Sequence, residues 1–393
     1  MSQSDLSKSP VLADLRGKFR AKYGRDPDVV AYAPGRVEIL GNHTDYNEGV
    51  VLSAAINFGT FFAVAKRDDA TVRLTAGDID ETVEFPVSAP EASATSTWSN
   101  YVRGVVAGLN AVRPLTCGAD AMLLGNIPLG AGLSSSAALE MCACLAFAEL
   151  AGITLGKVEM AKIGQAAEHK YAGVKCGLLD QLSSVCGVEG CLVWSDFRSL
   201  EVETVGISPD TCFLLCNTHA KHALVDGAYN ERREACERGA AYFASVLPHK
   251  VTALRDVTLA ELEAHRAGLD DVTARRCAHP IGEDERVLAG VDLLRKGDVE
   301  GFGALMFASH DSSRHNFENS CPELDTLVDT AHNIPGVLGA RLSGGGFGGS
   351  VIALVRTRDV EAAAAAFRNA YEKTYGVPCD TRVIQCSAGA TLV

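Results

Sequence analysis

The sequence has no excess of basic residues. Among its 393 residues, 36 are Lys or Arg and 49 are Asp or Glu, so the formal net charge is −13 at pH 7. A protein that binds nucleic acid without sequence preference needs clustered Lys and Arg side chains to displace phosphate counterions. We therefore expect no nucleic-acid partner, and we expect any anionic ligand to be attracted by local groups rather than by the overall charge.

Cysteine pairs with the spacing of a metal site are also absent. The chain has 13 cysteines, an odd number, and no Cys-x-x-Cys occurs. Several lie in apolar runs, where a reduced thiol behaves as a small hydrophobic side chain: Cys142, Cys144, Cys212 and Cys216. Buried, reduced cysteines are typical of cytoplasmic proteins, and we expect that location here.

Long hydrophobic runs are missing as well. The N-terminal MSQSDLSKSP lacks the apolar stretch of a secretion signal, and the most apolar helical stretch, 137–150, is short and carries two glutamates. We therefore expect no membrane association. No linker, low-complexity run or internal repeat divides the chain. With 47% hydrophobic and 22% charged residues, the composition is that of a globular protein of roughly two to three domains.

Short apolar runs and helical patterns follow one another without a regular strand–helix alternation. We expect strands at 29–33, 50–56, 61–66, 72–75, 83–85, 121–124, 192–196, 213–217, 351–355 and 381–385. We expect helices at 11–23, 98–112, 134–150, 158–171, 229–245, 284–295, 299–310, 323–333 and 360–375. This order predicts an α+β fold in two lobes, residues 1–205 and 206–393.

The segment PLGAGLSSSAALE, from Pro128, is the most informative. Two glycines precede three serines that open an Ala-rich helix. Glycines allow close approach of the backbone to an anion, and the start of a helix attracts phosphate. The segment has neither the Gly-Lys-Ser/Thr of a Walker A loop nor the GxGxxG of a dinucleotide site. A serine-capped helix is the alternative, but one serine suffices for a cap, so we favour a phosphate site.

Two other segments have unusual local composition. LSGGGFGGS, 342–350, has five glycines, which indicate either a flexible turn or a backbone wall against a ligand or another loop. APGRVEILGNHTDYNEG, 33–49, gathers short polar side chains after a strand. They suit hydrogen bonding to sugar hydroxyls, with Arg36 available for phosphoryl charge, although a simple polar turn has the same composition.

Two carboxylates complete the set. Asp180 lies in an apolar setting in CGLLDQLSS, where it is either a helix cap or a functional acid. Glu168 lies on a predicted helix in QAAEHKYAG, where a solvated surface position is the default interpretation.

Together and in this order, the segments resemble the galactokinase branch of the GHMP sugar and metabolite kinases. GRVEILGNHTDYNEG is the specific marker of that branch, whereas the glycine–serine loop and the C-terminal glycine cluster are shared across the superfamily. WSNYVRG from Trp98, AYNERREAC from Ala228 and SHDSSRHNFENSCPELDTLV from Ser309 also match. The resemblance covers 15–385. It implies a two-lobed fold with the active site between the lobes and ATP-dependent phosphorylation of an anomeric sugar hydroxyl.

The resemblance also implies residue roles. Asp180 would face the anomeric hydroxyl, as a general base or as a positioning group, with Arg36 beside the transferred phosphoryl group. Ser136 and Glu168 would ligate Mg²⁺. ATP would contact Trp98 and the loop residues Gly130, Ala131, Gly132, Leu133, Ser134, Ser135 and Ser136. The sugar would contact Asn42, His43, Thr44, Asp45, Gly177 and Tyr229.

One position departs from the family pattern. Galactokinases carry Glu where this chain has Asn42, and that Glu accepts a hydrogen bond from the 6-hydroxyl of the sugar. Asn42 is neutral and can donate as well as accept. We expect D-galactose as substrate. A sugar altered at carbon 6 or carbon 2, such as galacturonate or a deoxy- or amino-galactose, is one alternative, and a non-catalytic sugar- and ATP-binding regulator is another. The intact Ser135, Ser136 and Asp180 argue against a regulator, and we expect no obligate protein partner.

Overall fold

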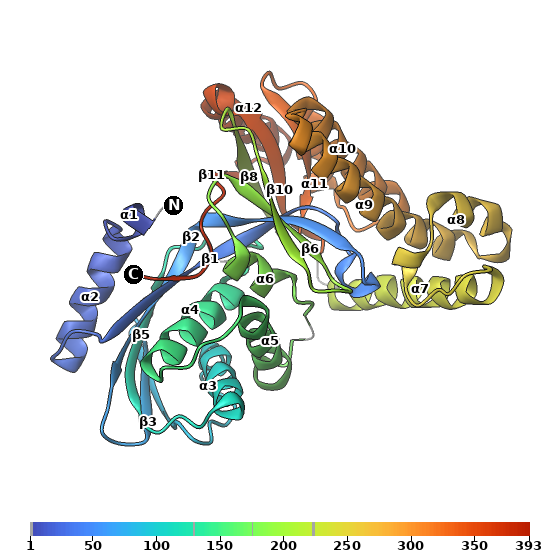
Figure 1. Ribbon diagram of the computed structural model, residues 1–393. Helices are drawn as coiled ribbons and strands as arrows, with labels where there is room; N and C mark the ends of the chain where they lie inside the picture. The colour runs from blue at the N-terminus through green and yellow to red at the C-terminus, as the bar shows by residue number, and fades with distance from the viewer. Residues whose placement is uncertain (1–2, 129, 175, 222–224) are drawn as a thin grey trace.

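Two β-sheets with helices packed against them make up the computed structural model (Figure 1). The structure describes residues 3–128, 130–174, 176–221 and 225–393. The strands of the first sheet are β1 (Val29–Leu40), β2 (Val50–Lys66), β3 (Thr71–Ala76), β4 (Glu81–Pro86), β5 (Ala119–Gly125), β6 (Cys191–Asp196), β7 (Val202–Gly206) and β12 (Thr391–Leu392). Their order is β12-β1-β2-β5-β3-β4, with β6 on the first part of β2 and β7 beside β6. The parallel pair is β3–β5, and the other pairs in the sheet are antiparallel.

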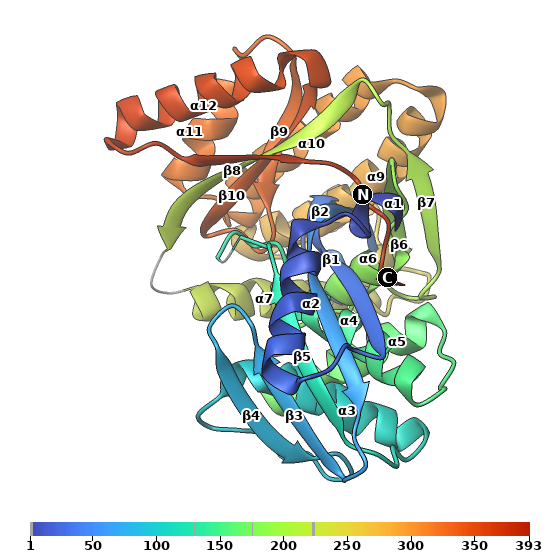
Figure 2. The ribbon, with the colours of Figure 1, turned by 90° about the vertical axis from the view of Figure 1, so that its left-hand side faces the viewer.

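Different helices cover the two faces of this sheet (Figure 2). Because side chains alternate along a strand, Ala31 and Phe62 point to one face while Tyr32 and Phe61 point to the other. The first face packs on α3 (Asn100–Val112), α4 (Ser135–Leu150) and α5 (Lys157–Ala167). The second face packs on α2 (Pro10–Tyr23), which follows the single turn α1 (Gln3–Leu6).

The second sheet has the order β11-β8-β10-β9 and is antiparallel throughout. Its strands are β8 (Thr211–Lys221), β9 (Val337–Ser343), β10 (Gly348–Arg356) and β11 (Asp380–Ile384). Leu214 and Val351 on one face pack on α11 (Pro322–Ala331) and α12 (Val360–Tyr375).

The opposite face of the second sheet meets the first sheet in a shared apolar core. Phe213 and Ile352 from the second sheet belong to the same buried cluster as Val37 of β1 and Leu52 of β2. The helices α9 (Asp271–Lys296) and α10 (Val299–Ser312) also contribute to it. Beyond them, α7 (Val225–Val246) and α8 (Leu259–His265) pack on α9 as an arm at the right of Figure 1.

Three loops come together beside this core. Residues 41–49 join β1 to β2, residues 126–134 lead from β5 to α4, and residues 344–347 join β9 to β10. The backbone N–H of Arg36 donates to the carbonyl of Leu133, and the Ser350 hydroxyl donates to the carbonyl of Ala131. The three motif-bearing segments are therefore neighbours in space although they are far apart in sequence.

The α+β fold predicted from the sequence is confirmed, with differences at several elements. β2 is one continuous strand rather than two, because its first part pairs with β6 and its second with β5. α9 begins at Asp271 rather than at 284, since the helix continues through Pro280. The pattern also missed β7, β9, β12, α8 and α6 (Leu179–Cys186).

Two further sequence expectations concern cysteines and membranes. The 13 cysteines all fall within the described residues and are free thiols, most of them buried, as expected. No helix in the described part of the chain is both long enough and apolar enough to span a lipid bilayer.

Candidate functional site

An ion pair between Arg36 and Asp180 joins β1 to α6. Nε and Nη2 of Arg36 lie 2.7 and 2.6 Å from Oδ1 of Asp180, and Nη1 donates to the carbonyl of Gly132 at 2.7 Å. The Ser134 hydroxyl donates to the other oxygen, Oδ2. The N-cap of α6 is Leu178, so Asp180 is not the helix cap that the sequence left open. Both candidate catalytic residues are thus held at the phosphate loop.

The loop before α4 has an unusual backbone conformation. Gly130 and Gly132 have φ of 72° and 73°, and Ser134 has φ of 51°, all in the left-handed region. The side chains of Ala131 and Leu133 are buried in the shared core and anchor the loop. The first turn of a helix has unpaired N–H groups and the positive end of its dipole, and these attract phosphate.

A cavity of about 500 Å³ adjoins the start of α4. Trp98, Tyr101 and Leu139 contribute flat or apolar walls, and Ser135 and Ser136 lie at its edge. The indole Nε1 of Trp98 is buried and has no hydrogen-bond partner among the described residues. A planar heterocycle can stack in such a cavity while its phosphates reach the loop, so the structure brings Trp98 and the serines together.

The two candidate magnesium ligands have different surroundings. Ser136 is in the first turn of α4, and Glu168 begins a π-helical turn (Glu168–Ala172) after α5. Glu168 is 5% exposed, so the surface interpretation of this carboxylate is wrong. Glu140, one turn after Ser136, is fully buried, and its pKa is raised to about 10 by burial and then by the charge of Glu168.

These donors fit a magnesium ion in their chemistry. A hydroxyl and a carboxylate are oxygen ligands, and Mg²⁺ takes few protein ligands because it retains waters and phosphate oxygens. The described residues contain no cluster of three or more His, Cys, Asp or Glu side chains that would form a complete protein cage. Ser136 and Glu168 are oxygen donors of the kind that Mg²⁺ accepts.

His43 is fixed between aromatic rings and the glycine cluster. Its Nε2 lies 3.2 Å from the carbonyl of Gly345, and its Nδ1 lies 2.9 Å from the Tyr46 hydroxyl. The rings of Phe317 and Tyr229 lie 4.5 and 5.2 Å away, centroid to centroid. Burial lowers the pKa of His43 to about 4, so the imidazole is neutral at pH 7 and donates from Nε2.

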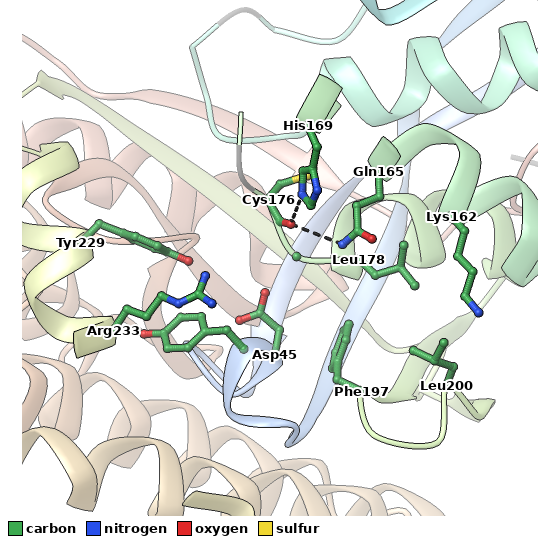
Figure 3. Close-up of a pocket in the computed structure, with 12 residues that line it drawn as sticks. Asp45, Lys162, Gln165, His169, Cys176, Leu178, Phe197, Leu200, Tyr229 and Arg233 are labelled. Carbon is green, nitrogen blue, oxygen red and sulfur yellow. Dashed lines mark hydrogen bonds between the residues drawn. The ribbon is translucent and has the colours of Figure 1, made fainter. Parts of the chain in front are cut away.

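Asp45, Gly177 and Tyr229 line a second cavity, of about 560 Å³ (Figure 3). The Asp45 carboxylate points toward Arg233, and a Cβ on Gly177 would come within 2.1 Å of its Oδ2. Any larger residue at 177 would therefore displace the Asp45 carboxylate. Burial, followed by the charge of Glu38, raises the pKa of Asp45 to about 6. Three of the six candidate sugar residues thus share one cavity.

Asn42 and Thr44 have a different placement. Asn42 is 1% exposed, and its Nδ2 donates to Oε1 of Glu38 at 2.9 Å and to the carbonyl of Gly344 at 2.7 Å. Its Oδ1 accepts from Nδ2 of Asn319 at 2.9 Å. The Thr44 hydroxyl is buried and lies 2.8 Å from the carbonyls of both Gly41 and Val50, which share its one proton. Both side chains are occupied with other protein groups.

The glycine cluster is a backbone wall rather than a free turn. Gly344 and Gly345 present carbonyls to Asn42 and His43, and a Cβ on Gly346 would come within 2.1 Å of the Asn319 carbonyl. Four further residues adjoin the site and were not expected there from the sequence: Glu38, Arg341, Asn319 and Tyr101. Glu38 lies in GRVEILGNHTDYNEG and Tyr101 in WSNYVRG, so the charge of the first and the ring of the second were signals that could have indicated them.

Known proteins resemble this chain over most of its length. The family profile described as "Galactokinase galactose-binding signature" matches residues 17–66. Those for the N-terminal and C-terminal domains of GHMP kinases match 100–188 and 291–373. A galactokinase of Mannheimia succiniciproducens is 42% identical over 386 residues, covering 96% of this chain and 99% of that protein. The chain belongs to the galactokinase family. A Haemophilus influenzae galactokinase is 40% identical, covering 95% and 97% of the two chains.

Solved structures extend the likeness to the fold. A galactokinase from Lactococcus lactis, crystallised with galactose, superposes with a TM-score of 0.90 at 33% identity, covering 97% of this chain and 99% of that one. A mevalonate kinase superposes with a TM-score of 0.62 at 16% identity, covering 92% and 100% of the two chains, which shows the shared fold alone. The galactokinase resemblance seen in the sequence motifs is confirmed.

Proposed function

We propose that this protein transfers the γ-phosphoryl group of ATP to the anomeric hydroxyl of D-galactose and releases galactose 1-phosphate. The observation that carries the proposal is the Arg36–Asp180 pair, because it ties the sugar motif on β1 to the phosphate loop. The family membership and the galactose-binding signature over 17–66 support galactose as the sugar.

The proposed roles follow from the contacts. Asp180 accepts the proton of the anomeric hydroxyl or orients that hydroxyl toward the phosphorus, and Arg36 neutralises charge on the transferred group. Because Arg36 and Ser134 hold both oxygens of Asp180, the carboxylate is pre-oriented before substrate binds. Such positioning contributes to phosphoryl transfer even where proton removal is a minor part of the barrier.

ATP would bind with its base beside Trp98 and Tyr101 and its phosphates at the start of α4. Ser136 and Glu168 would hold Mg²⁺, which neutralises phosphate charge when bound. Asp45 and Tyr229 would hold the sugar in the second cavity, with Gly177 leaving room for the Asp45 carboxylate.

The test is a panel of sugars in an assay of ATP consumption, with the product identified by phosphorus NMR. D-Galactose should give the highest kcat/KM, and the product should carry phosphate on carbon 1. If galacturonate or a deoxy- or amino-galactose gives a higher kcat/KM than galactose, that sugar is the substrate instead. Binding of galactose and ATP without turnover would favour the regulator instead.

We also propose that the two lobes divide near residue 205. β7 ends at Gly206 in the first sheet, and β8 begins at Thr211 in the second. β12 belongs to the first sheet, so the first lobe would include the C-terminal strand as well as residues before the boundary.

A further inference from the structure

A buried polar network lies where the sugar motif meets the second sheet. Glu38 of β1 is at its centre, with a side chain that is 7% exposed. Its Oε1 accepts from Nδ2 of Asn42 at 2.9 Å and from Nη1 of Arg341 at 3.2 Å. Arg341 is completely buried on β9 and also donates to the carbonyl of Ile39. One oxygen of Glu38 is therefore held from both sides.

The other oxygen of Glu38 is free to accept. Within the described residues, Oε2 takes part in no hydrogen bond and is not fully enclosed by protein atoms. A carboxylate whose one oxygen is fixed presents the second in a defined direction. Burial raises the pKa of Glu38, and the charges of Arg341 and Arg36 oppose that rise. In its ionised form the second oxygen suits a hydroxyl donor, because hydrogen bonds to a charged group are stronger than those between neutral groups.

The position of Glu38 on β1 indicates which space this carboxylate faces. No bulge separates Arg36 from Glu38, so the two side chains lie on one face of the strand, where Arg36 binds Asp180. The charge of Glu38 contributes, together with that of Asp180, to the raised pKa of Asp45. The same three carboxylates raise the pKa of the Tyr229 hydroxyl, after burial. Asp45 and Tyr229 line the proposed sugar cavity. Tyr229 packs on His43, which follows the Asn42 that Glu38 binds, so the contacts connect Glu38 to that cavity.

We propose that Glu38, and not Asn42, is the specificity-determining residue of this motif, with its carboxylate accepting a hydrogen bond from a sugar hydroxyl that is not phosphorylated. This inference rests on the proposed galactose 1-kinase function. Asn42 is a positioning residue, since its amide ties Glu38 to Gly344 and Asn319 and has no donor left for the sugar. Although residue 42 is neutral, the site therefore retains a carboxylate, that of Glu38, which is hydrogen-bonded to Asn42.

The experiment is Glu38→Gln assayed with galactose and its 2-, 3-, 4- and 6-deoxy analogues. Losing a hydrogen bond to a charged acceptor corresponds to roughly tenfold to a hundredfold in affinity. We expect the substitution to lower kcat/KM for galactose by about tenfold, mainly through KM. For one deoxy analogue, kcat/KM should change by less than about threefold, because that analogue lacks the hydroxyl that would bind Glu38. A fall by the same factor for galactose and all four analogues, or no fall at all, overturns the inference.

Glu283→Gln is the matched control. Glu283 is a fully buried carboxylate of the same region, but it accepts from the backbone N–H groups of Gly41 and Asn42 and from Arg286. The Glu283→Gln variant should change kcat/KM by one common factor for all five sugars, and its melting temperature should be lower than that of the wild type. If Glu283→Gln also spares kcat/KM for one deoxy analogue alone, the effect of Glu38→Gln comes from a general loss of order in the site, and the proposal is overturned.

A second set of variants covers the case in which Glu38→Gln does not fold. Glu38→Asn should lose galactose affinity, measured by calorimetry without ATP, and adding Asn42→Glu should restore a large part of it by returning a carboxylate to the pair. Failure of the double variant to bind better than the single one contradicts the inference. If the wild-type protein does not phosphorylate galactose, the proposed function fails and this inference with it. If the wild-type protein phosphorylates galactose but the Glu38 variants lower kcat/KM equally for all five sugars, the inference is refuted and the proposed function stands.

Discussion

Replacing Asp180 by Asn gives the sharpest test of the catalytic assignment. Asn has nearly the same shape but carries no charge and accepts protons poorly. In the structure, Asp180 Oδ1 receives two N–H groups of Arg36, and Oδ2 receives the Ser134 hydroxyl. An amide can retain the contact with Arg36 through its oxygen, whereas its NH₂ group must turn toward Ser134, which can still accept through its hydroxyl oxygen.

Stability and turnover should respond by different amounts. The Asp180 side chain is 24% exposed, so weakening its charge-assisted bonds should lower the free energy of unfolding by about 1–3 kcal/mol. Turnover should fall by about 10²–10⁴-fold, which corresponds to about 3–5 kcal/mol in the activation barrier. The measurements are kcat/KM in a coupled ADP-release assay and the midpoint of chemical unfolding.

Asp120→Asn is the matched control. Asp120 on β5 is a buried carboxylate that accepts from Arg67 and Arg73 at 2.9 Å, outside the candidate site. This variant should lose comparable stability and retain its kcat/KM. If Asp180→Asn retains more than about a tenth of wild-type turnover, which is above what the loss of an acid–base group allows, Asp180 does not act on the hydroxyl. If both variants lose activity in proportion to stability, the effect is structural.

The remaining predictions concern the metal, the nucleotide and the sugar. Ser136→Ala and Glu168→Gln should each raise the Mg²⁺ concentration needed for half-maximal velocity, since each weakens an oxygen ligand; unchanged titrations in both would remove these residues from the metal site. Trp98→Ala should raise KM for ATP by about tenfold or more through lost stacking and burial, and KM for galactose should stay within about twofold. An equal rise in both constants would contradict the nucleotide cavity. Asp45 has a pKa near 6, raised by burial and by Glu38, so wild-type kcat/KM for galactose should fall as the pH drops below about 6 and this carboxylate is protonated. Asp45→Asn should lower kcat/KM at neutral pH and remove that acid limb, and an acid limb at the same position in the variant would refute the assignment.

The sequence was most informative where local pattern decides structure. The β-type run at 29–33 and the Ala-rich run of α4 predicted their elements, although β1 continues to Leu40. The glycine–serine loop lies at the start of α4 as expected. The Arg36–Asp180 contact joins residues 144 positions apart, and it was accessible only through the family resemblance.

The errors came where tertiary contacts override local pattern. The sequence pattern predicted that Glu168 is exposed on the surface of a helix. In the structure it begins a π-helical turn and is buried. The sequence predicted a helix only at 284–295, yet α9 begins at Asp271 and passes through Pro280. The partners of Asn42 lie on β1, in the glycine cluster and after α10, so its occupied amide could not be deduced from the motif alone.

The apolar core shared by the two sheets has a consequence for how substrates enter and leave. Phe213 and Ile352 are packed against Val37 and Leu52, and all four side chains are at most 1% exposed. Separating the two sheets would expose this apolar contact to water, at a free-energy cost of about 25 cal/mol for every Å² of apolar surface. It would also break the ion pair between Glu38 and Arg341. We therefore expect ligand traffic to depend on small movements of the segments around the cavity mouths, with the joint between the halves staying closed throughout the catalytic cycle.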